Sequence, residues 1–404
     1  MSTAAIRRLT AVPSPEELIG RAREMVPEIR GLAEETERNR NLFPHIVDKI
    51  RDAELLRTCR PKEFGGFEYD GEVALRIALT ISAACASTGW TVNGAVSNGM
   101  SLAHFPIETQ RELWERDEDF FTFACFAPTG TATPVDGGYL LNGRWSFASG
   151  CDIARWGKLG AMIAAPNSEA PPQGAFFLLP IDDCEIVDTW FVCGLTGTGS
   201  KDIVVCDRFV PAHRVLPFSE TRAGTSPGAR HHTNPIYRMP LLMLGASMLA
   251  STAIGAAKGA LDAYLEMTTG RQTRGALAGG GLRMVEFATV QLRLAEAAAS
   301  VEAAELILLT DMRNAMQRLR AGEEITVADR IRSRRNQAYV TRLAVQAVEA
   351  LNASTGGYGL HLSNPVQRAW RDANAVARHV SLNWDAVGTM YGQHAFGLEP
   401  KGQY

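Results

Sequence analysis

The stretch GRWSFASG, residues 143–150, is the part of the sequence that is most informative about the fold. It lies in a block where short segments rich in aromatic and β-branched residues are bounded by Gly, Pro, Asp and Asn. These segments are 120–127, 138–142, 156–165, 174–180, 184–187 and 200–210. The glycine pair Gly137-Gly138 between two of them suggests a hairpin. We therefore predict an all-β domain over residues 119–218.

Helical patterns flank this block on both sides. Before it, Ser14-Pro15-Glu16-Glu17 has the form of a helix start, and apolar residues follow at helical spacing. Further helices are predicted over 44–53, 71–86 and 107–116, and after the block over 241–265, 285–312, 326–351 and 365–388. Residues 220–237 and the glycine-rich 270–281 are predicted to be irregular. The fold class is thus α+β, with an N-terminal helical domain (1–118), the β domain (119–218) and a C-terminal helical bundle (219–404).

Composition excludes several classes of protein. The 404 residues exceed what one hydrophobic core of roughly 250–300 residues holds. With 41 basic and 44 acidic residues, the chain has no electrostatic footprint for nucleic acid or a membrane surface. The N-terminus lacks a signal-peptide core, and the seven cysteines are scattered without a C-x-x-C pair, so a cytoplasmic, reduced protein is predicted.

No metal, dinucleotide or phosphate site is predicted. His231-His232 has no carboxylate at ligand spacing, and Gly194–Gly199 does not fit G-x-G-x-x-G. The basic run formed by Arg330, Arg332, Arg334 and Arg335 is interpreted as a solvated or inter-subunit face.

Three separated segments resemble the acyl-CoA dehydrogenase superfamily. GRWSFASG is similar to a strand motif of that superfamily, and GLTGTGS (194–200), followed by a strand and Val210-Pro211, is similar to the element that ends its β domain. Arg371-Asp372-Ala373 matches its R-D-A element. The resemblance spans nearly the whole chain. It implies an N-terminal helical domain, a central β-barrel or sandwich domain, and a C-terminal four-helix bundle, with a flavin between the last two.

A second layer of similarity separates dehydrogenation from oxygenation. The superfamily's dehydrogenases abstract a proton with a glutamate that here falls on or near Val380, and no acid occurs between Asp372 and Asp385. An apolar side chain cannot act as a base. The pattern Arg371-Asp372-x₆-His379, the segment ACASTGW (84–90) and RWSFASG instead resemble two-component flavin-dependent monooxygenases. These oxygenase components hydroxylate p-hydroxyphenylacetate, steroid-derived phenols or indole compounds.

This resemblance implies an enzyme that inserts one atom of O₂ into an aromatic or heteroaromatic small molecule through a flavin C4a-hydroperoxide. Reduced FMN or FAD would come from a separate flavin reductase, in agreement with the missing dinucleotide motif. Ser149 would hold flavin N5–H. His379 would deprotonate a phenol or indole N–H, or hydrogen-bond the peroxide, and Asn383 would orient its ring from one helical turn away. The implied cofactor contacts are Phe123, Phe126, Thr129, Trp145, Phe147, Ser149, Gly150, Arg271 and Arg274.

The implied substrate contacts are Asn93, Asn98, Met100, His104 and Asn383. Asn98 stands where phenol-hydroxylating relatives carry a histidine, and His104 has the alternative role of ending a helix before Pro106. Three other functions stay open: an acyl-CoA dehydrogenase or nitroalkane-oxidase-like enzyme, an N-oxygenase of an amine or amino sugar, and a non-catalytic homologue. The resemblance also implies a homotetramer.

Overall fold

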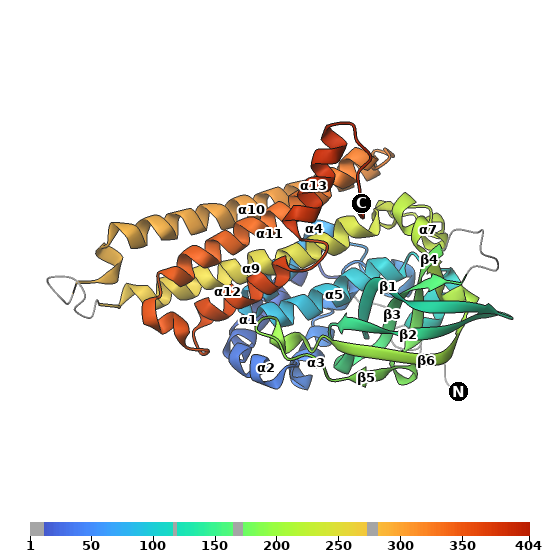
Figure 1. Ribbon diagram of the computed structural model, residues 1–404, viewed down its shortest axis with the longest axis horizontal. Coiled ribbons are helices and arrows are strands. Elements are labelled where there is room, and N and C mark those ends of the chain that lie inside the picture. The colour runs from blue at the N-terminus through green and yellow to red at the C-terminus, as the bar shows by residue number, and fades with distance from the viewer. Residues whose placement is uncertain (1–11, 116–118, 165–172, 273–281) are drawn as a thin grey trace.

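The computed structural model describes residues 12–115, 119–164, 173–272 and 282–404. Helices come first along the chain, then a sheet, then further helices, with the sheet at one end of the molecule and long helices α9 to α11 running away from it (Figure 1). The first helices are α1 (Pro15–Gly31), α2 (Ala33–Asn39), α3 (Pro44–Asp52), α4 (Gly71–Ala84), α5 (Ala86–Leu102) and α6 (Ile107–Trp114). The last are α7 (Phe218–Ala223), α8 (Pro227–His231), α9 (Leu241–Thr269), α10 (Ala288–Arg320), α11 (Val327–Ala353), α12 (Pro365–Ala377) and α13 (Trp384–Ala395).

One sheet of seven strands forms the middle of the chain, in the order β5-β6-β2-β1-β3-β4-β7. Its strands are β1 (Phe121–Val135), β2 (Gly138–Ala148), β3 (Ala154–Ile163), β4 (Gln173–Pro180), β5 (Glu185–Val187), β6 (Lys201–Pro211) and β7 (Val215–Pro217). The predicted hairpin at Gly137-Gly138 is confirmed, because β1 and β2 pair antiparallel with Val135 opposite Gly138. By contrast, β1 and β3 run parallel.

Trp145 of β2 lies in the core of this sheet. Its indole Nε1 donates a hydrogen bond to the carbonyl oxygen of Gly160 over 2.6 Å, and its side chain is 1% exposed. The ring fits because Gly130 has no side chain: a Cβ there would come within 2.0 Å of the indole. The glycines around residue 145 therefore serve the packing of a large aromatic side chain inside a sheet.

The N-terminal helices pack on the same core. Ser14 caps α1 in a capping box with Glu17, as the sequence predicts, and the buried face of α1 is Leu18, Ile19, Ala22, Met25 and Ile29. Helix α9 is long and apolar enough to cross a membrane, yet 78% of its most apolar stretch is buried inside the protein. It packs against α4, α5, α11 and α12. The one apolar helix found among the described residues is therefore a core helix.

Three features differ from the sequence prediction. Helix α5 was not predicted, because Gly, Ser, Thr and Asn are weak helix formers and its helical conformation depends on burial between neighbours. Residues 220–237, predicted to be irregular, contain the end of α7, α8 and the start of a 3₁₀ turn, Pro235–Arg238. The predicted last helix over 365–388 is wrong, since α12 ends at Ala377 and α13 begins at Trp384.

Candidate functional site

Three separate segments converge at the end of β2. Ser149 Oγ accepts a hydrogen bond from Trp90 Nε1 over 2.9 Å, and it lies 2.7 Å from Ser200 Oγ. The next residue, Gly150, donates its backbone N–H to Thr198 O over 2.9 Å and has a φ of 75°. A strand end, helix α5 and the loop before β6 thus hold one half-buried serine hydroxyl in place.

The Arg371-Asp372 pair of α12 fixes the same loop from the other side. Asp372 Oδ1 accepts the backbone N–H of Leu195 over 2.7 Å, and Arg371 donates to Cys193 O over 2.7 Å while pairing with Glu37. Burial raises the pKa of Asp372 to about 6, although the hydrogen bond from Leu195 N–H acts to lower it. The R-D-A element therefore joins the C-terminal helices to the sheet.

His379 lies in the turn between α12 and α13, with its ring centroid 5.7 Å from that of Trp90. Its Nδ1 accepts the backbone N–H of Ser381 over 3.1 Å, so the neutral ring carries its proton on Nε2. Burial, with the charge of Arg334 as a second cause, lowers the pKa of His379 to about 4. At neutral pH this side chain is therefore an uncharged donor at Nε2.

A buried guanidinium supports this turn. Arg334 of α11 donates to Ser381 O over 2.8 Å, to Gln337 Oε1 over 2.7 Å and to Gln403 O over 3.2 Å. Burial lowers its pKa to about 10, which leaves it charged at neutral pH. The sequence prediction that the whole basic run is a solvated or inter-subunit face is wrong for Arg334, which is 3% exposed.

One stripe of helix α5 is accessible. Trp90, Gly94 and Ser97 follow the i, i+4, i+7 spacing of one helix face and are partly exposed, whereas the other residues of α5 are buried. A Cβ built on Gly94 would meet nothing within 4 Å, so open space adjoins this face. We call these three residues the α5 stripe. It runs from Ser149 toward the far end of α5.

An aromatic pocket lies beyond the stripe's far end. It is lined by Phe126, Phe176, Phe218, Thr221, Pro240, Leu241, Leu242, Gln403 and Tyr404. Phe126 and Phe176 stand edge to face with ring centroids 5.1 Å apart. Gln403 also accepts from Arg334, so this pocket and the His379 turn share one guanidinium. The lining is mostly aromatic and apolar, and the pocket has a volume of about 50 Å³.

Phe147 has the marks of a ligand contact. It is 69% exposed and has a φ of 69°, a left-handed conformation that costs about 1–2 kcal/mol for a residue with a side chain. Its ring stands edge to face with Trp190, with centroids 6.0 Å apart. Phe147 thus presents an exposed aromatic ring from a strained backbone, two residues before the half-buried Ser149. Such a ring can pack against a planar cofactor such as a flavin.

The structure does not bring every predicted cofactor contact to this place. Trp145 and Phe123 are each 1% exposed in the sheet core, and Thr129 is an exposed residue whose Oγ1 donates to Arg144 O over 2.9 Å. Arg271 folds onto its own chain: it donates to Thr355 O over 2.7 Å and lies 4.7 Å from the ring of Tyr358. Arg274 lies outside the described residues.

Of the predicted substrate contacts, Asn93 and Met100 face the protein core, whereas Asn98 contacts Lys158 and His104 is buried beyond the end of α5. Asn93 Nδ2 donates to Thr252 Oγ1 over 2.8 Å and so faces α9, and Met100 is 1% exposed in the core. Asn98 Nδ2 donates to Thr122 O over 3.1 Å, while its Oδ1 lies 3.3 Å from Lys158 Nζ. His104, beyond the end of α5, is fully buried with Nδ1 2.8 Å from Ser226 Oγ.

Asn383 lies with His379 in the turn and is not one helical turn along a shared helix. It is exposed and caps α13, with its Oδ1 accepting the backbone N–H of Ala386 over 3.1 Å. The predicted orientation of the His379 ring by Asn383 is therefore wrong in its geometry. The backbone N–H of Ser381 orients the ring instead.

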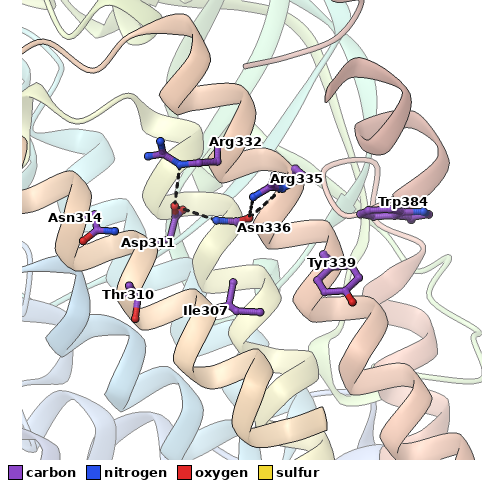
Figure 2. A pocket seen from close by; sticks show the side chains of 9 residues that line it. All are labelled: Ile307, Thr310, Asp311, Asn314, Arg332, Arg335, Asn336, Tyr339 and Trp384. Carbon is purple, nitrogen blue, oxygen red and sulfur yellow. Dashed lines mark hydrogen bonds and ion pairs between the residues drawn. The ribbon is translucent and has the colours of Figure 1, made fainter. Parts of the chain in front are cut away.

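A separate depression of about 540 Å³ lies between α10, α11 and α13, away from Ser149. Figure 2 shows Asp311 at its base, reached by Arg332 at 4.0 Å and by Asn336 Nδ2 at 3.1 Å, with Tyr339 and Trp384 to one side. Burial raises the pKa of Asp311. Arg332 and Arg335 of the basic run line this depression.

The structure adds a carboxylate to the histidine pair. Glu63 Oε2 lies 2.8 Å from His231 Nε2, and the ligand atoms of Glu63, His231 and His232 lie within 4.8 Å of one another. His232 Nε2 is 2.8 Å from Gln110 Oε1. The sequence prediction that no carboxylate lies near His231 and His232 is therefore wrong, because Glu63 comes from a distant part of the chain. The absence of a bound metal stays a prediction.

The sequence prediction missed Trp90, Gly94, Ser97 and Lys158. The first three were overlooked because α5 itself was not predicted, although their spacing is that of one helix face. Lys158 could have been noticed as the charged residue in the otherwise apolar segment WGKLGAMIAA (156–165).

Comparisons with known proteins agree with this arrangement. The models of the acyl-CoA dehydrogenase N-terminal and C-terminal domains match residues 15–116 and 247–384. The oxygenase component of an FADH₂-dependent resorcinol hydroxylase from Rhizobium sp. (strain MTP-10005) is 48% identical over 392 residues, which are 96% of each chain.

Solved structures give the same result. A 3-HSA hydroxylase from Rhodococcus sp. RHA1 superimposes with a TM-score of 0.89 at 33% identity, covering 96% of this chain and 98% of that chain. XiaF from Streptomyces sp., in complex with FADH₂ and glycerol, gives 0.88 at 28% identity, covering 96% and 97%. Reduced flavin is thus bound by a homologue. This chain belongs to the flavin-dependent monooxygenases whose oxygenase components, served by a reductase, are built on the acyl-CoA dehydrogenase fold.

Proposed function

We propose that this chain hydroxylates a small phenol, using O₂ and reduced FMN or FAD delivered by a separate flavin reductase. The observation that carries the proposal is the Ser149–Trp90–His379 arrangement beside the open α5 stripe. The relative that is 48% identical acts on resorcinol, which makes a phenol with one ring the first substrate to test. Reduced flavin supplies the electrons that activate O₂.

Phe147, Ser149 and His379 have separate roles in this proposal. Phe147 would hold the flavin with its exposed ring, and the Ser149 hydroxyl, fixed by Trp90 and Ser200, would bind a polar edge of it. His379 offers its Nε2–H as a hydrogen-bond donor to the transferred oxygen, since Nδ1 is already occupied by Ser381 N–H. This favours the donor role over deprotonation of the substrate. Because Ser149 and His379 are half-buried, few water molecules reach them, and this limits the release of hydrogen peroxide in place of hydroxylation.

Dehydrogenation is disfavoured by the same geometry. Val380, at the expected glutamate position, is 75% exposed in the turn, and Asp372 is buried on the backbone N–H of Leu195. Neither can take a Cα proton. N-oxygenation of an amine uses the same flavin chemistry, and product analysis distinguishes it from ring hydroxylation.

The test is a substrate screen with a generic flavin reductase. Purified protein, NADH, FAD or FMN and O₂ are mixed with resorcinol, 4-hydroxyphenylacetate, indole or an aromatic amine, and products are read by mass. We expect one added oxygen atom on a phenol. Consumption of reduced flavin with only hydrogen peroxide as product, for every compound in the panel, would overturn the proposal.

We also propose that the protein assembles as a homotetramer and is located in the cytoplasm. Long helix α10 exposes Leu292 (59%) and Leu306 (63%), which suits burial against other copies in a homotetramer. The seven cysteines are free thiols, as expected in the cytoplasm. Light scattering after size exclusion tests the first point: a mass of four chains supports it, and a monomer contradicts it.

A further inference from the structure

Lys158 of β3 is a buried amine. Its side chain is 1% exposed, and its ammonium contacts Asn98 Oδ1 at 3.3 Å and Ser101 Oγ. It also lies 4.9 Å and 5.3 Å from the ring centroids of Phe126 and Phe176. Among the described residues, these contacts include no carboxylate. A buried charge is costly unless it is paired, so an anionic partner is missing from this place.

Lys158 contacts residues of both the helix that carries the α5 stripe and the aromatic pocket. Asn98 and Ser101 belong to α5, beyond Gly94 and Ser97 of the α5 stripe, and Phe126 and Phe176 line the aromatic pocket. Lys158 therefore lies between the stripe and the pocket. Along α5, eleven residues separate Trp90 from Ser101, roughly 16 Å of helix. That length accommodates the reacting edge of a flavin and one substrate ring.

The charge of Lys158 also acts on His104, a second buried titratable group. His104 Nε2 is buried without a hydrogen-bond partner, and the charge of Lys158 helps to depress the pKa of His104 to about 3, after burial itself. His104 is thus uncharged at neutral pH and cannot neutralise Lys158. Burial lowers the pKa of Lys158 to about 7, so the amine exchanges its proton near neutral pH.

Of the described residues near the site, no other group suits the removal of a phenolic proton. His379 carries its proton on Nε2, and the Asn98 amide beside Lys158 does not titrate. Phenols react with electrophilic oxygen mainly through the phenolate, which has the more electron-rich ring. A base beside the phenol is therefore needed, and an amine is the group that this chain provides.

We propose that Lys158 is the catalytic base and counter-ion for the substrate phenol. This rests on the proposed function. The phenol O–H bond breaks, its proton goes to the amine, and the ammonium pairs with the phenolate oxygen. When the ring carbon gains its oxygen atom, the phenolate oxygen becomes a carbonyl. It then takes the proton back from Lys158 as the ring carbon loses its own hydrogen to water.

The experiment uses the full chain without flavin, so that it is independent of oxygenation. The probe is 4-nitrophenol, which is yellow only when ionised, titrated from about pH 5 to pH 9. We expect the wild type to bind it as the yellow phenolate below the pH at which the free probe ionises. Lys158→Met should lose the yellow bound form and bind the probe about tenfold more weakly or worse, since a charge-assisted hydrogen bond is lost.

Two further variants separate the roles. Lys158→Arg keeps the charge but cannot accept a proton at these pH values, so it should hold the phenolate and yet hydroxylate slowly. Lys258→Met is the matched control, because Lys258 of α9 is paired with Glu305 at 2.6 Å, and it should behave as the wild type. Replacing a buried amine with Met preserves volume, so Lys158→Met should fold, which circular dichroism checks.

Three outcomes would overturn the inference: a yellow complex of equal strength in Lys158→Met, a colourless complex in the wild type, or no binding of the probe by the wild type. Each leaves the proposed function standing if the wild type still adds oxygen to a phenol. The proposed function fails separately, in the substrate screen, when no phenol gains oxygen.

Discussion

The indole N–H of Trp90 donates a hydrogen bond to Ser149 Oγ over 2.9 Å, although 59 residues separate the two in the chain. The same indole ring contacts His379, 289 residues further along than Trp90, at a centroid distance of 5.7 Å. One tryptophan therefore links the serine at the end of β2 to the histidine between α12 and α13.

Removing the Ser149 hydroxyl should uncouple the enzyme. In Ser149→Ala, reduced flavin should still be oxidised, but the fraction that yields hydroxylated product should fall about tenfold, the equivalent of one hydrogen bond of about 1.4 kcal/mol. Product and hydrogen peroxide are measured together. Ser146→Ala, an exposed serine of the same strand, is the control and should stay coupled. An unchanged product yield in Ser149→Ala would remove Ser149 from the reacting centre.

Trp90→Phe tests whether the indole acts through Ser149. The ring contact with His379 is kept while the N–H donor is lost, so coupling should fall by less than in Ser149→Ala. The double variant should be no worse than Ser149→Ala, because residues in one hydrogen-bond network are not additive. Additive losses would mean that Trp90 acts by another route.

The pH dependence of stability should report His379. Its folded-state pKa of about 4 lies below the unfolded value of about 6.5, so the unfolded chain binds the proton first. The contribution of His379 to the free energy of unfolding is therefore full above about pH 6.5 and is lost as the pH falls toward 4. His379→Gln, which cannot titrate, should flatten this part of the curve in urea denaturation. An unchanged slope between the two proteins would contradict the burial of a neutral ring.

Asp372 should make the free energy of unfolding depend on pH in the opposite direction to His379. Its pKa of about 6 is above the ordinary value of 3.8, so the folded chain binds the proton first and stability falls as the pH rises from about 4 to 6. Asp372→Asn keeps an acceptor for Leu195 N–H and should be at least as stable as the wild type at pH 7. Asp372→Ala should lose about 1–3 kcal/mol, because a buried N–H is left without a partner. Equal stability of the Asn and Ala variants would refute this.

Phe147→Gly should separate stability from cofactor binding. Relief of the left-handed strain and the greater freedom of unfolded glycine oppose one another, so the free energy of unfolding should change by less than about 1 kcal/mol. Affinity for reduced flavin should nevertheless fall about tenfold. Phe209→Gly, which removes another exposed ring (49%) from the adjacent strand β6, should leave flavin affinity unchanged. Equal flavin affinity in both variants would exclude Phe147 as a contact.

The order of helices, sheet and helices follows from sequence pattern, since glycine-bounded apolar segments and capped amphipathic helices are local signals. Helix α5 was not predicted, because its Gly, Ser and Asn residues are helical through burial and not through propensity. The candidate site likewise combines residues that were predicted from sequence with residues that were not. Ser149 and His379 were predicted from motif resemblance. Lys158 and the α5 stripe left only weak local signals, and the contact of β3 with α5 that brings them together joins distant segments of the chain.

The most direct test is a crystal structure of the protein with reduced flavin bound under anaerobic conditions. The account predicts the N5 edge of the flavin within hydrogen-bond distance of Ser149 Oγ, the ring against Phe147, and His379 Nε2 facing the reacting edge. A flavin seated elsewhere, for instance in the depression above Asp311, with Ser149 and Trp90 bonded only to each other, would contradict it.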